Sequence, residues 1–113
     1  MSNHQPVLMT EALEGLAVIE DGWYVDGTYG RGGHSAGILA RLGGHGRLLA
    51  LDKDPQAVDH AQRSFAADAR FSIRHGGFED PRKHTEPWLG AHPLAGVLLD
   101  LGVSSPQLEA PER

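Results

Sequence analysis

The 113-residue sequence contains no cysteine. This absence excludes disulfide bonds, thiolate zinc sites, iron–sulfur clusters and a cysteine nucleophile, and it fits a reducing compartment. Long apolar runs are also missing, because segments such as 48–51 and 97–99 fall far short of the roughly 20 residues that cross a bilayer. The first residues lack a basic flank followed by a continuous apolar stretch, so no secretory signal peptide is predicted. We therefore expect a cytoplasmic protein with no membrane segment.

A surplus of positive charge is missing as well. The chain has 10 Lys and Arg residues against 15 Asp and Glu residues, which gives a net charge of −5 and a pI near 5.7. Such a chain has no global attraction for nucleic acid, so contact with RNA would need a local basic patch or sequence outside this chain. Hydrophobic residues make up 40% and charged residues 22% of the sequence, which is typical of a globular domain. The length suits one domain, which we place at residues 1–113.

Short apolar segments alternate with helix-like segments along the chain. Strands are predicted at 23–26, 47–52, 70–74 and 94–100, and helices at 35–42, 55–67 and 80–90, the last interrupted by Pro87. Asp54 and Pro55 suit the N-cap and the first position of the second of these helices, and Thr10 is a candidate N-cap for a leading helix. This alternation predicts an α/β fold with a Rossmann-like, doubly wound parallel sheet. In such folds, ligands bind outside the carboxyl ends of the strands.

The first predicted strand ends in a glycine-rich segment, in which residues 26–35 read DGTYGRGGHS. Four glycines in seven residues, between a strand and a helix, let a ligand approach bare backbone N–H groups near a helix N-terminus. The dinucleotide pattern G-x-G-x-x-G, started at Gly30, lacks its third glycine, and the segment has no lysine for a Walker loop. A turn that uses glycine for geometry alone is the alternative. We favour cofactor binding, because four glycines exceed what a turn needs.

Candidate ligand-binding side chains follow the later strands. Asp52 ends the second strand 19 residues after Gly33, where an acidic side chain binds the ribose hydroxyls of an adenine nucleotide in such folds. Helix capping is the alternative for Asp52, although Asp54 already suits that role. Phe78 follows the third strand and either lies against an adenine face or belongs to the core. Asp100 ends the fourth strand, near the point where the strand order is expected to reverse. It is either a functional group or a loop carboxylate whose hydrogen bonds are made within the protein.

Two other chemistries are disfavoured. The seven histidines include no H-x-x-x-H pair, and no thiols accompany them, so no metal site is predicted. Ser104 and Ser105 do not lie in a G-x-S-x-G elbow, so a serine hydrolase is a poor interpretation.

Several segments together resemble the bacterial 16S ribosomal RNA cytosine-N4 methyltransferases, which use S-adenosylmethionine. The matching residues are His4-x-Pro6-Val7-Leu8 with Glu11, Asp26-Gly27-Thr28-x-Gly30-x-Gly32-Gly33-His34-Ser35, Leu51-Asp52-x-Asp54-Pro55-x-Ala57, and Asp100-Leu101-Gly102-Val103-Ser104-Ser105-Pro106-Gln107-Leu108 with Glu112-Arg113. The block from Asp100 to Leu108 is highly specific, whereas the glycine-rich segment alone indicates only a nucleoside cofactor. Glu109 stands where members of this family usually have Asp, which keeps the charge.

The resemblance implies part of a class I methyltransferase fold with S-adenosylmethionine as its cofactor. The implied contacts are Gly32, Gly33 and His34 with the methionine end, Asp52 with the ribose, Phe78 with the adenine, and Asp100 and Gln107 closing the pocket. The implied reaction is methylation of a cytidine N4 amino group, with Asp100 or a loop carbonyl accepting an N4–H bond. The cofactor has no pyrophosphate, which explains why neither phosphate-binding pattern is present, and its cationic sulfonium suits an acidic pocket.

Members of this family continue beyond the position of Arg113, with further strands and an inserted domain expected to contact RNA. The resemblance therefore implies that this chain is the cofactor-binding front part, inactive alone, with ribosomal RNA or the small ribosomal subunit as a partner mainly through sequence absent here. A non-catalytic nucleoside-binding module is one alternative. A nicotinamide-binding domain is another, opposed by the missing third glycine. The edge of the fourth strand, at Val97 to Leu99, predicts self-association of the chain.

Overall fold

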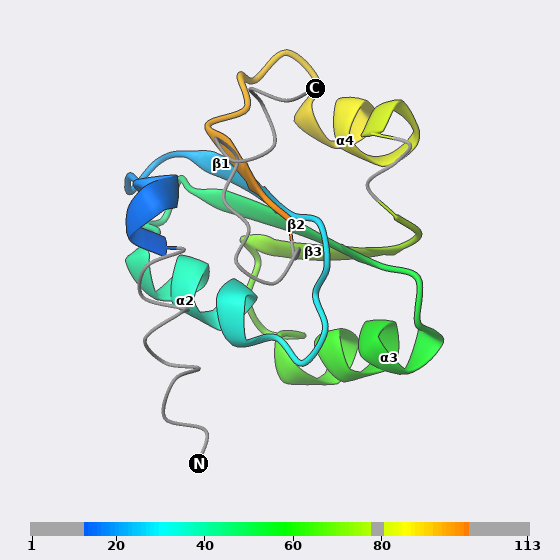
Figure 1. Cartoon of the computed structure of the whole chain (residues 1–113). Helices are drawn as coiled ribbons and strands as arrows, with labels where there is room; N and C mark the ends of the chain where they lie inside the picture. Colours follow the sequence, from blue (N-terminus) through cyan, green and yellow to red (C-terminus); the bar gives the residue numbers. More distant parts are fainter. Residues whose placement is uncertain (1–12, 78–80, 100–113) are drawn as a thin grey trace.

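A computed structural model describes residues 13–77 and 81–99 of the chain. It contains four strands, β1 (Trp23–Asp26), β2 (Arg47–Asp52), β3 (Phe71–His75) and β4 (Gly96–Leu98), joined by α2 (Gly33–Arg41), α3 (Pro55–Ser64) and α4 (Pro81–Leu89). All strand pairs are parallel, and the order in the sheet is β3-β2-β1-β4 (Figure 1). The chain therefore winds outward in one direction from β1 to β3 and then crosses to the other side of β1. The predicted doubly wound α/β sheet is confirmed.

The strand predictions hold closely for the centre of the sheet and less well for its edge. β1 and β2 have the predicted bounds, and β3 is shifted by one residue. β4 is shorter than the predicted strand 94–100, because the only strand that pairs with it within residues 13–77 and 81–99 is the four-residue β1, whose Tyr24 to Asp26 pair with Gly96 to Leu98. Asp100, the end of the predicted strand, lies outside the described residues.

Helices cover both faces of the sheet (Figure 1), and three apolar clusters lie between the layers. The first cluster joins Tyr24, Leu48 and Leu98 of the sheet to α2. The second joins Ala50 to Ala57 and Ala61 of α3, and the third joins Val25, Leu49 and Leu51 to Trp88 of α4. Successive strand residues alternate between faces, so β2 is buried on both, as its continuous apolar sequence predicts.

The helix ends show where local sequence signals were sufficient. Asp54 caps α3, because its carboxylate accepts the N–H of Gln56 at 2.9 Å and Pro55 occupies the first helical position, as predicted. The predicted interruption of the third connecting helix is wrong, since α4 continues through Pro87. Pro87 and Lys83 are both exposed, so solvent can satisfy the carbonyl group that loses its helical donor. Residues 13–16 form a helical turn, whereas Thr10 lies outside the described residues. None of the helices in the described ranges is long and apolar enough to cross a membrane.

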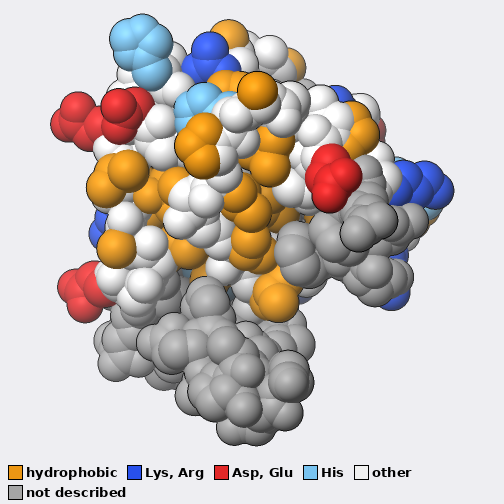
Figure 2. Space-filling model, turned by 90° about the horizontal axis from the view of Figure 1, so that it is seen from above, with side chains coloured by type: hydrophobic (Ala, Val, Ile, Leu, Met, Phe, Trp, Pro, Cys, Tyr) orange, Lys and Arg blue, Asp and Glu red, His pale blue; other side chains and the backbone are white. Residues whose placement is uncertain are grey.

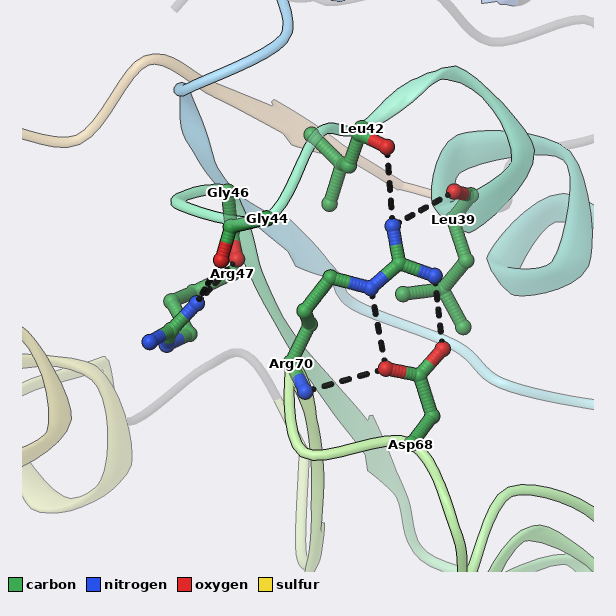
Figure 3. Close-up of polar contacts among 7 residues, drawn as sticks. All are labelled: Leu39, Leu42, Gly44, Gly46, Arg47, Asp68 and Arg70. Atoms are coloured by element: carbon green, nitrogen blue, oxygen red, sulfur yellow. Dashed lines mark hydrogen bonds and ion pairs between the residues drawn. The ribbon is translucent and has the colours of Figure 1, made fainter.

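Arg70 joins α2 to the turn that precedes β3 (Figure 3). Its Nη1 donates to the carbonyl oxygens of Leu39 and Leu42 at 2.9 and 2.8 Å, at the C-terminal end of α2. Its Nε and Nη2 donate to the two carboxylate oxygens of Asp68 at 2.9 and 2.7 Å. Hydrogen bonding by the Arg70 side chain lowers the pKa of Asp68 below its ordinary value. These contacts hold α2 against the sheet at the amino ends of the strands, opposite the edge where ligands are expected.

Candidate functional site

The carboxyl ends of β1 and β2 each carry a buried carboxylate. Asp26 ends β1 and is 1% exposed, and Asp52 ends β2 and is 9% exposed. The parallel register pairs Asp26 with Ala50, so the two acids lie near one edge of the sheet, which we call the carboxyl edge. Buried carboxylates need hydrogen-bond donors, and both obtain them from the segment that follows β1.

Asp26 links the end of β1 to the start of α2. One carboxylate oxygen accepts the N–H of Thr28 at 3.2 Å, and the other accepts the hydroxyl of Ser35 at 2.7 Å. Ser35 lies in the first turn of α2 and is fully buried. Sequence reasoning misses Asp26 as a site residue, although Asp26 is an acidic residue at the end of a strand, as Asp52 is. Its contacts make it an anchor for the residues around the site.

The glycine loop, residues 27–33, crosses the carboxyl edge and is held there by backbone hydrogen bonds. The N–H of Gly27 donates to Leu98 of β4 at 2.7 Å, and the N–H of Tyr29 donates to Leu51 of β2 at 2.8 Å. Gly30 and Gly32 have left-handed backbones, with φ values of 59° and 89°. Glycine is favoured at both positions for this reason, so geometry accounts for two of the four glycines in the loop.

The same loop delivers the amino end of α2 to the carboxyl edge. Gly32 is the N-cap of α2 and has no side chain with which to cap it. The helix therefore begins at Gly33 with the N–H groups of its first turn lacking a side-chain acceptor from the cap residue. Gly33 is exposed and His34 is half-buried, so both are accessible at this edge. Bare N–H groups and the positive end of the helix dipole suit a ligand carboxylate or another acceptor.

Asp52 brings the loops after β1 and β2 together. Its Oδ2 accepts the N–H of Gly30 at 2.7 Å, and its Oδ1 accepts the N–H of Asp54 at 2.9 Å. The alternative of helix capping is wrong for Asp52, since the N-cap of α3 is Asp54. A carboxylate offers about four acceptor positions, so each oxygen retains capacity for a further donor. Two vicinal hydroxyl groups of a ribose would fit that capacity.

The predicted site residues fall into two groups. Gly32, Gly33, His34 and Asp52 all lie along the carboxyl edge, as the strand-end rule predicted. Phe78, Asp100 and Gln107 lie outside the described residues. The edge continues to β3, because the N–H of Gly76 donates to the carbonyl of Asp52 at 2.8 Å. Within residues 13–77 and 81–99, no cluster of three or more His, Asp or Glu side chains is placed to hold a metal ion.

Comparison with known proteins gives a consistent result over the whole chain. The model of the MraW methylase family matches residues 1–113. A protein of Xylella fastidiosa (strain M23) named "Ribosomal RNA small subunit methyltransferase H" is 56% identical over 110 residues, which cover 97% of this chain and 34% of that protein. A protein of the same name from Coxiella burnetii (strain Dugway 5J108-111) is 56% identical over 115 residues, covering 100% of this chain and 37% of that protein. The chain thus spans about a third of the length of these relatives.

The fold is shared more widely than the sequence. The structure of a protein-L-isoaspartate O-methyltransferase superposes with a TM-score of 0.69 at 15% identity, over 84% of this chain and 29% of that one. At this identity the likeness concerns the fold alone. The four-stranded sheet and its crossover helices are part of the class I methyltransferase fold, as expected from the sequence.

Proposed function

Because the chain belongs to the MraW methylase family, we propose that its residues 1–113 form the S-adenosylmethionine-binding part of a methyltransferase. The observation that carries this proposal is the meeting of the glycine loop and Asp52, joined by the 2.7 Å hydrogen bond from Gly30. An acidic group at the end of β2 beside a glycine loop after β1 is how nucleoside cofactors are held in doubly wound folds.

The proposed contacts divide the cofactor between the two loops. Asp52 accepts hydrogen bonds from the ribose hydroxyl groups, using the acceptor capacity that Gly30 and Asp54 leave on each oxygen. Gly32, Gly33 and His34 bind the methionine end at the start of α2. Phe78 beside the adenine, and Asp100 and Gln107 at the closure of the pocket, complete the set of proposed contacts.

For a protein of the full length of these relatives, we propose methylation of the N4 amino group of a cytidine in 16S ribosomal RNA. S-adenosylmethionine supplies an electrophilic methyl group when bound. Asp100 is the proposed acceptor for an N4–H bond, which localises the nitrogen lone pair and raises its nucleophilicity. Binding that holds the nitrogen and the methyl carbon in line supplies most of the acceleration. The names of the 56% identical relatives support ribosomal RNA as the substrate. The cytoplasm is the proposed location.

This chain alone would bind the cofactor without turnover. With a net charge of −5, it offers nucleic acid no general attraction, so the contacts with ribosomal RNA would come mainly from sequence outside it. A non-catalytic nucleoside-binding module is the second candidate, since the glycine loop and Asp52 account for binding a nucleoside without any catalytic group. Methylation of small ribosomal subunits by the complete reading frame, and its loss in the Asp100→Asn variant, would favour the enzyme over this module.

We also propose that the isolated chain self-associates through the edge of β4. β4 has β1 as its only strand neighbour in the sheet of the described residues, which leaves its other side without a ladder partner there. Hydrophobic side chains gather on the face that carries α4 and β4 (Figure 2), and Leu94 in the loop before β4 is 37% exposed. Light scattering after size-exclusion chromatography should show species larger than the 12.1 kDa monomer. A clean monomer at all concentrations would contradict this proposal.

The first test of the cofactor is the thermal stability of the chain with S-adenosylmethionine or with NAD. Ligand at about 100 times its dissociation constant adds roughly 2.7 kcal/mol, enough to raise the midpoint by several degrees. The Asp52→Ala variant should lose the shift, whereas Asp59→Ala, an exposed change on α3, should keep it. A shift with NAD alone would indicate a nicotinamide-binding domain, and no shift with either ligand in a folded sample would refute the proposed site.

A further inference from the structure

Tyr29 lies in the middle of the glycine loop, yet its side chain belongs to the core. It is 2% exposed and packs with Ala50 of β2 and with Ala57 and Ala61 of α3. Gly30, the next residue along the loop, is exposed. The loop is therefore anchored from beneath by one aromatic ring, while Gly30 and Gly33 are exposed.

The Tyr29 ring is fixed by neighbours on two other elements. The ring of Phe65 stands edge-on to it and the ring of Phe71 is tilted against it, each with its centroid 6.2 Å away. The Tyr29 hydroxyl forms a 2.8 Å hydrogen bond with Nδ1 of His60, an exposed residue of α3. Burial raises the pKa of Tyr29, so the hydroxyl keeps its proton at neutral pH. This bond is a direct polar link between the glycine loop and α3.

The same residue also sets the backbone of the loop on either side of it. The Tyr29 N–H donates to Leu51 at 2.8 Å, and the Tyr29 carbonyl accepts the N–H of Gly32 at 2.8 Å. The hydroxyl lies over Gly32, where an added Cβ would be only 2.5 Å from it. Gly30, whose N–H reaches Asp52, directly follows. A shift of the Tyr29 ring would therefore move both the loop's contact with Asp52 and the cap of α2.

We infer that Tyr29, held by His60, is a positioning residue that keeps the glycine loop in its cofactor-binding geometry before the ligand arrives. This inference rests on the proposed function and deepens it. The Tyr29 side chain is buried in the core beneath the loop, so its effect is exerted through the backbone of Gly30 and Gly32. Fixing a binding loop in advance raises affinity, because less ordering has to occur when the ligand binds.

The test measures the affinity of the 113-residue chain for S-adenosylhomocysteine by calorimetry. Tyr29→Phe keeps the ring in the aromatic cluster and removes the hydroxyl, and it should weaken binding about three- to tenfold, the range expected for one lost hydrogen bond. His60→Leu should weaken binding similarly. His60→Asn, which places a polar amide atom near the position of Nδ1, should restore most of the affinity. Gln62→Leu, on the exposed surface of the same helix, is the matched control and should bind as the unmodified chain does.

Two further readouts separate positioning from general destabilisation. The double variant Tyr29→Phe with His60→Leu should bind no more weakly than either single variant, because all three lose the same bond. Without ligand, hydrogen exchange at the amides of Gly30 and Gly32 should accelerate in Tyr29→Phe and not in Gln62→Leu. If Tyr29→Phe fails to fold, the contrast between His60→Leu and His60→Asn carries the test.

The outcomes distinguish this inference from the proposed function. If the unmodified chain binds S-adenosylhomocysteine and both Tyr29→Phe and His60→Leu bind equally well, the positioning role is overturned and the proposed cofactor stands. If the folded, unmodified chain does not bind, the proposed function fails and the inference fails with it. Equal affinities of His60→Leu and His60→Asn, both weaker than the unmodified chain, would show that the hydrogen bond is not the cause.

Discussion

The carboxylate of Asp52 accepts the backbone N–H of Gly30 at 2.7 Å, and this hydrogen bond joins the end of β2 to the loop that follows β1. The two residues are 22 positions apart in the sequence. Asp52 therefore organises the loop as well as offering acceptors to a ligand. Substitutions at Asp52 should thus affect the folded chain before any ligand is added.

We expect Asp52→Asn to lower the free energy of unfolding by about 1–3 kcal/mol in the absence of ligand. An amide keeps one acceptor oxygen, so one of the two part-buried hydrogen bonds, from the N–H of Gly30 or of Asp54, is lost. Urea unfolding of the variant and of Asp59→Asn, an exposed carboxylate on α3, measures this difference. Equal stability of both variants would show that the bond to the loop is unimportant.

The glycine loop should tolerate alanine at Gly30 better than at Gly32. Both residues have left-handed backbones, which costs an alanine about 1 kcal/mol. At Gly32 the new Cβ would also lie 2.5 Å from the Tyr29 hydroxyl, whereas at Gly30 nothing lies within 4 Å. Thermal unfolding should rank Gly32→Ala below Gly30→Ala. Gly44→Ala, in open space and without a left-handed backbone, should match the unmodified chain.

Ser35→Ala should destabilise the chain by about 1–3 kcal/mol. The change removes a donor to the buried carboxylate of Asp26 and leaves that oxygen without the 2.7 Å hydrogen bond from Ser35. Gln62→Ala, at an exposed position on α3, serves as the control and should change stability by less than about 0.5 kcal/mol. Denaturant unfolding of the two variants is the measurement, and an equal loss in both would contradict the anchoring role of Asp26.

Arg70→Ala should cost about 2–3 kcal/mol, far more than Arg63→Ala. Arg70 supplies hydrogen bonds to Asp68 and to two carbonyl groups at the end of α2, and its side chain is 24% exposed. The Arg63–Asp59 pair has side chains that are 74% and 61% exposed, and such pairs contribute about 0–1 kcal/mol. The comparison requires only chemical denaturation of both variants. Equal costs would mean that the bridge in Figure 3 does not hold the layers together.

The Arg70–Asp68 bridge should weaken in acid. Folding lowers the pKa of Asp68, chiefly through the hydrogen bond from Arg70, so the folded state favours the charged carboxylate. The resulting stability is present above the ordinary pKa of an aspartate, about 3.9, and is lost as the pH falls through the lower folded value. The stability difference between the unmodified chain and Asp68→Asn should therefore shrink between about pH 5 and pH 2. A difference that stays constant over this range would contradict the assignment.

Local sequence signals predicted the centre of the fold and several positions of the site. The apolar runs of β1 and β2 gave their bounds, and Asp54 with Pro55 gave the start of α3, because propensity and capping act within a few residues. The wrong predictions concern elements whose bounds depend on their surroundings in the folded chain. β4 ends with its pairing to the short β1, and α4 continues through Pro87 because the affected turn faces solvent.

The sequence by itself determined the α/β class, the parallel sheet and the placement of Asp52, Gly32, Gly33 and His34 at the carboxyl edge, because hydrophobic period and glycine position are local properties. Only the tertiary structure decided which groups meet there. The bonds from Gly30 to Asp52, from Ser35 to Asp26 and between Tyr29 and His60 join residues 22, 9 and 31 positions apart. Such partners depend on strand order, register and the layer in which each helix packs. These are set by burial of the whole core, and no short stretch of sequence encodes them.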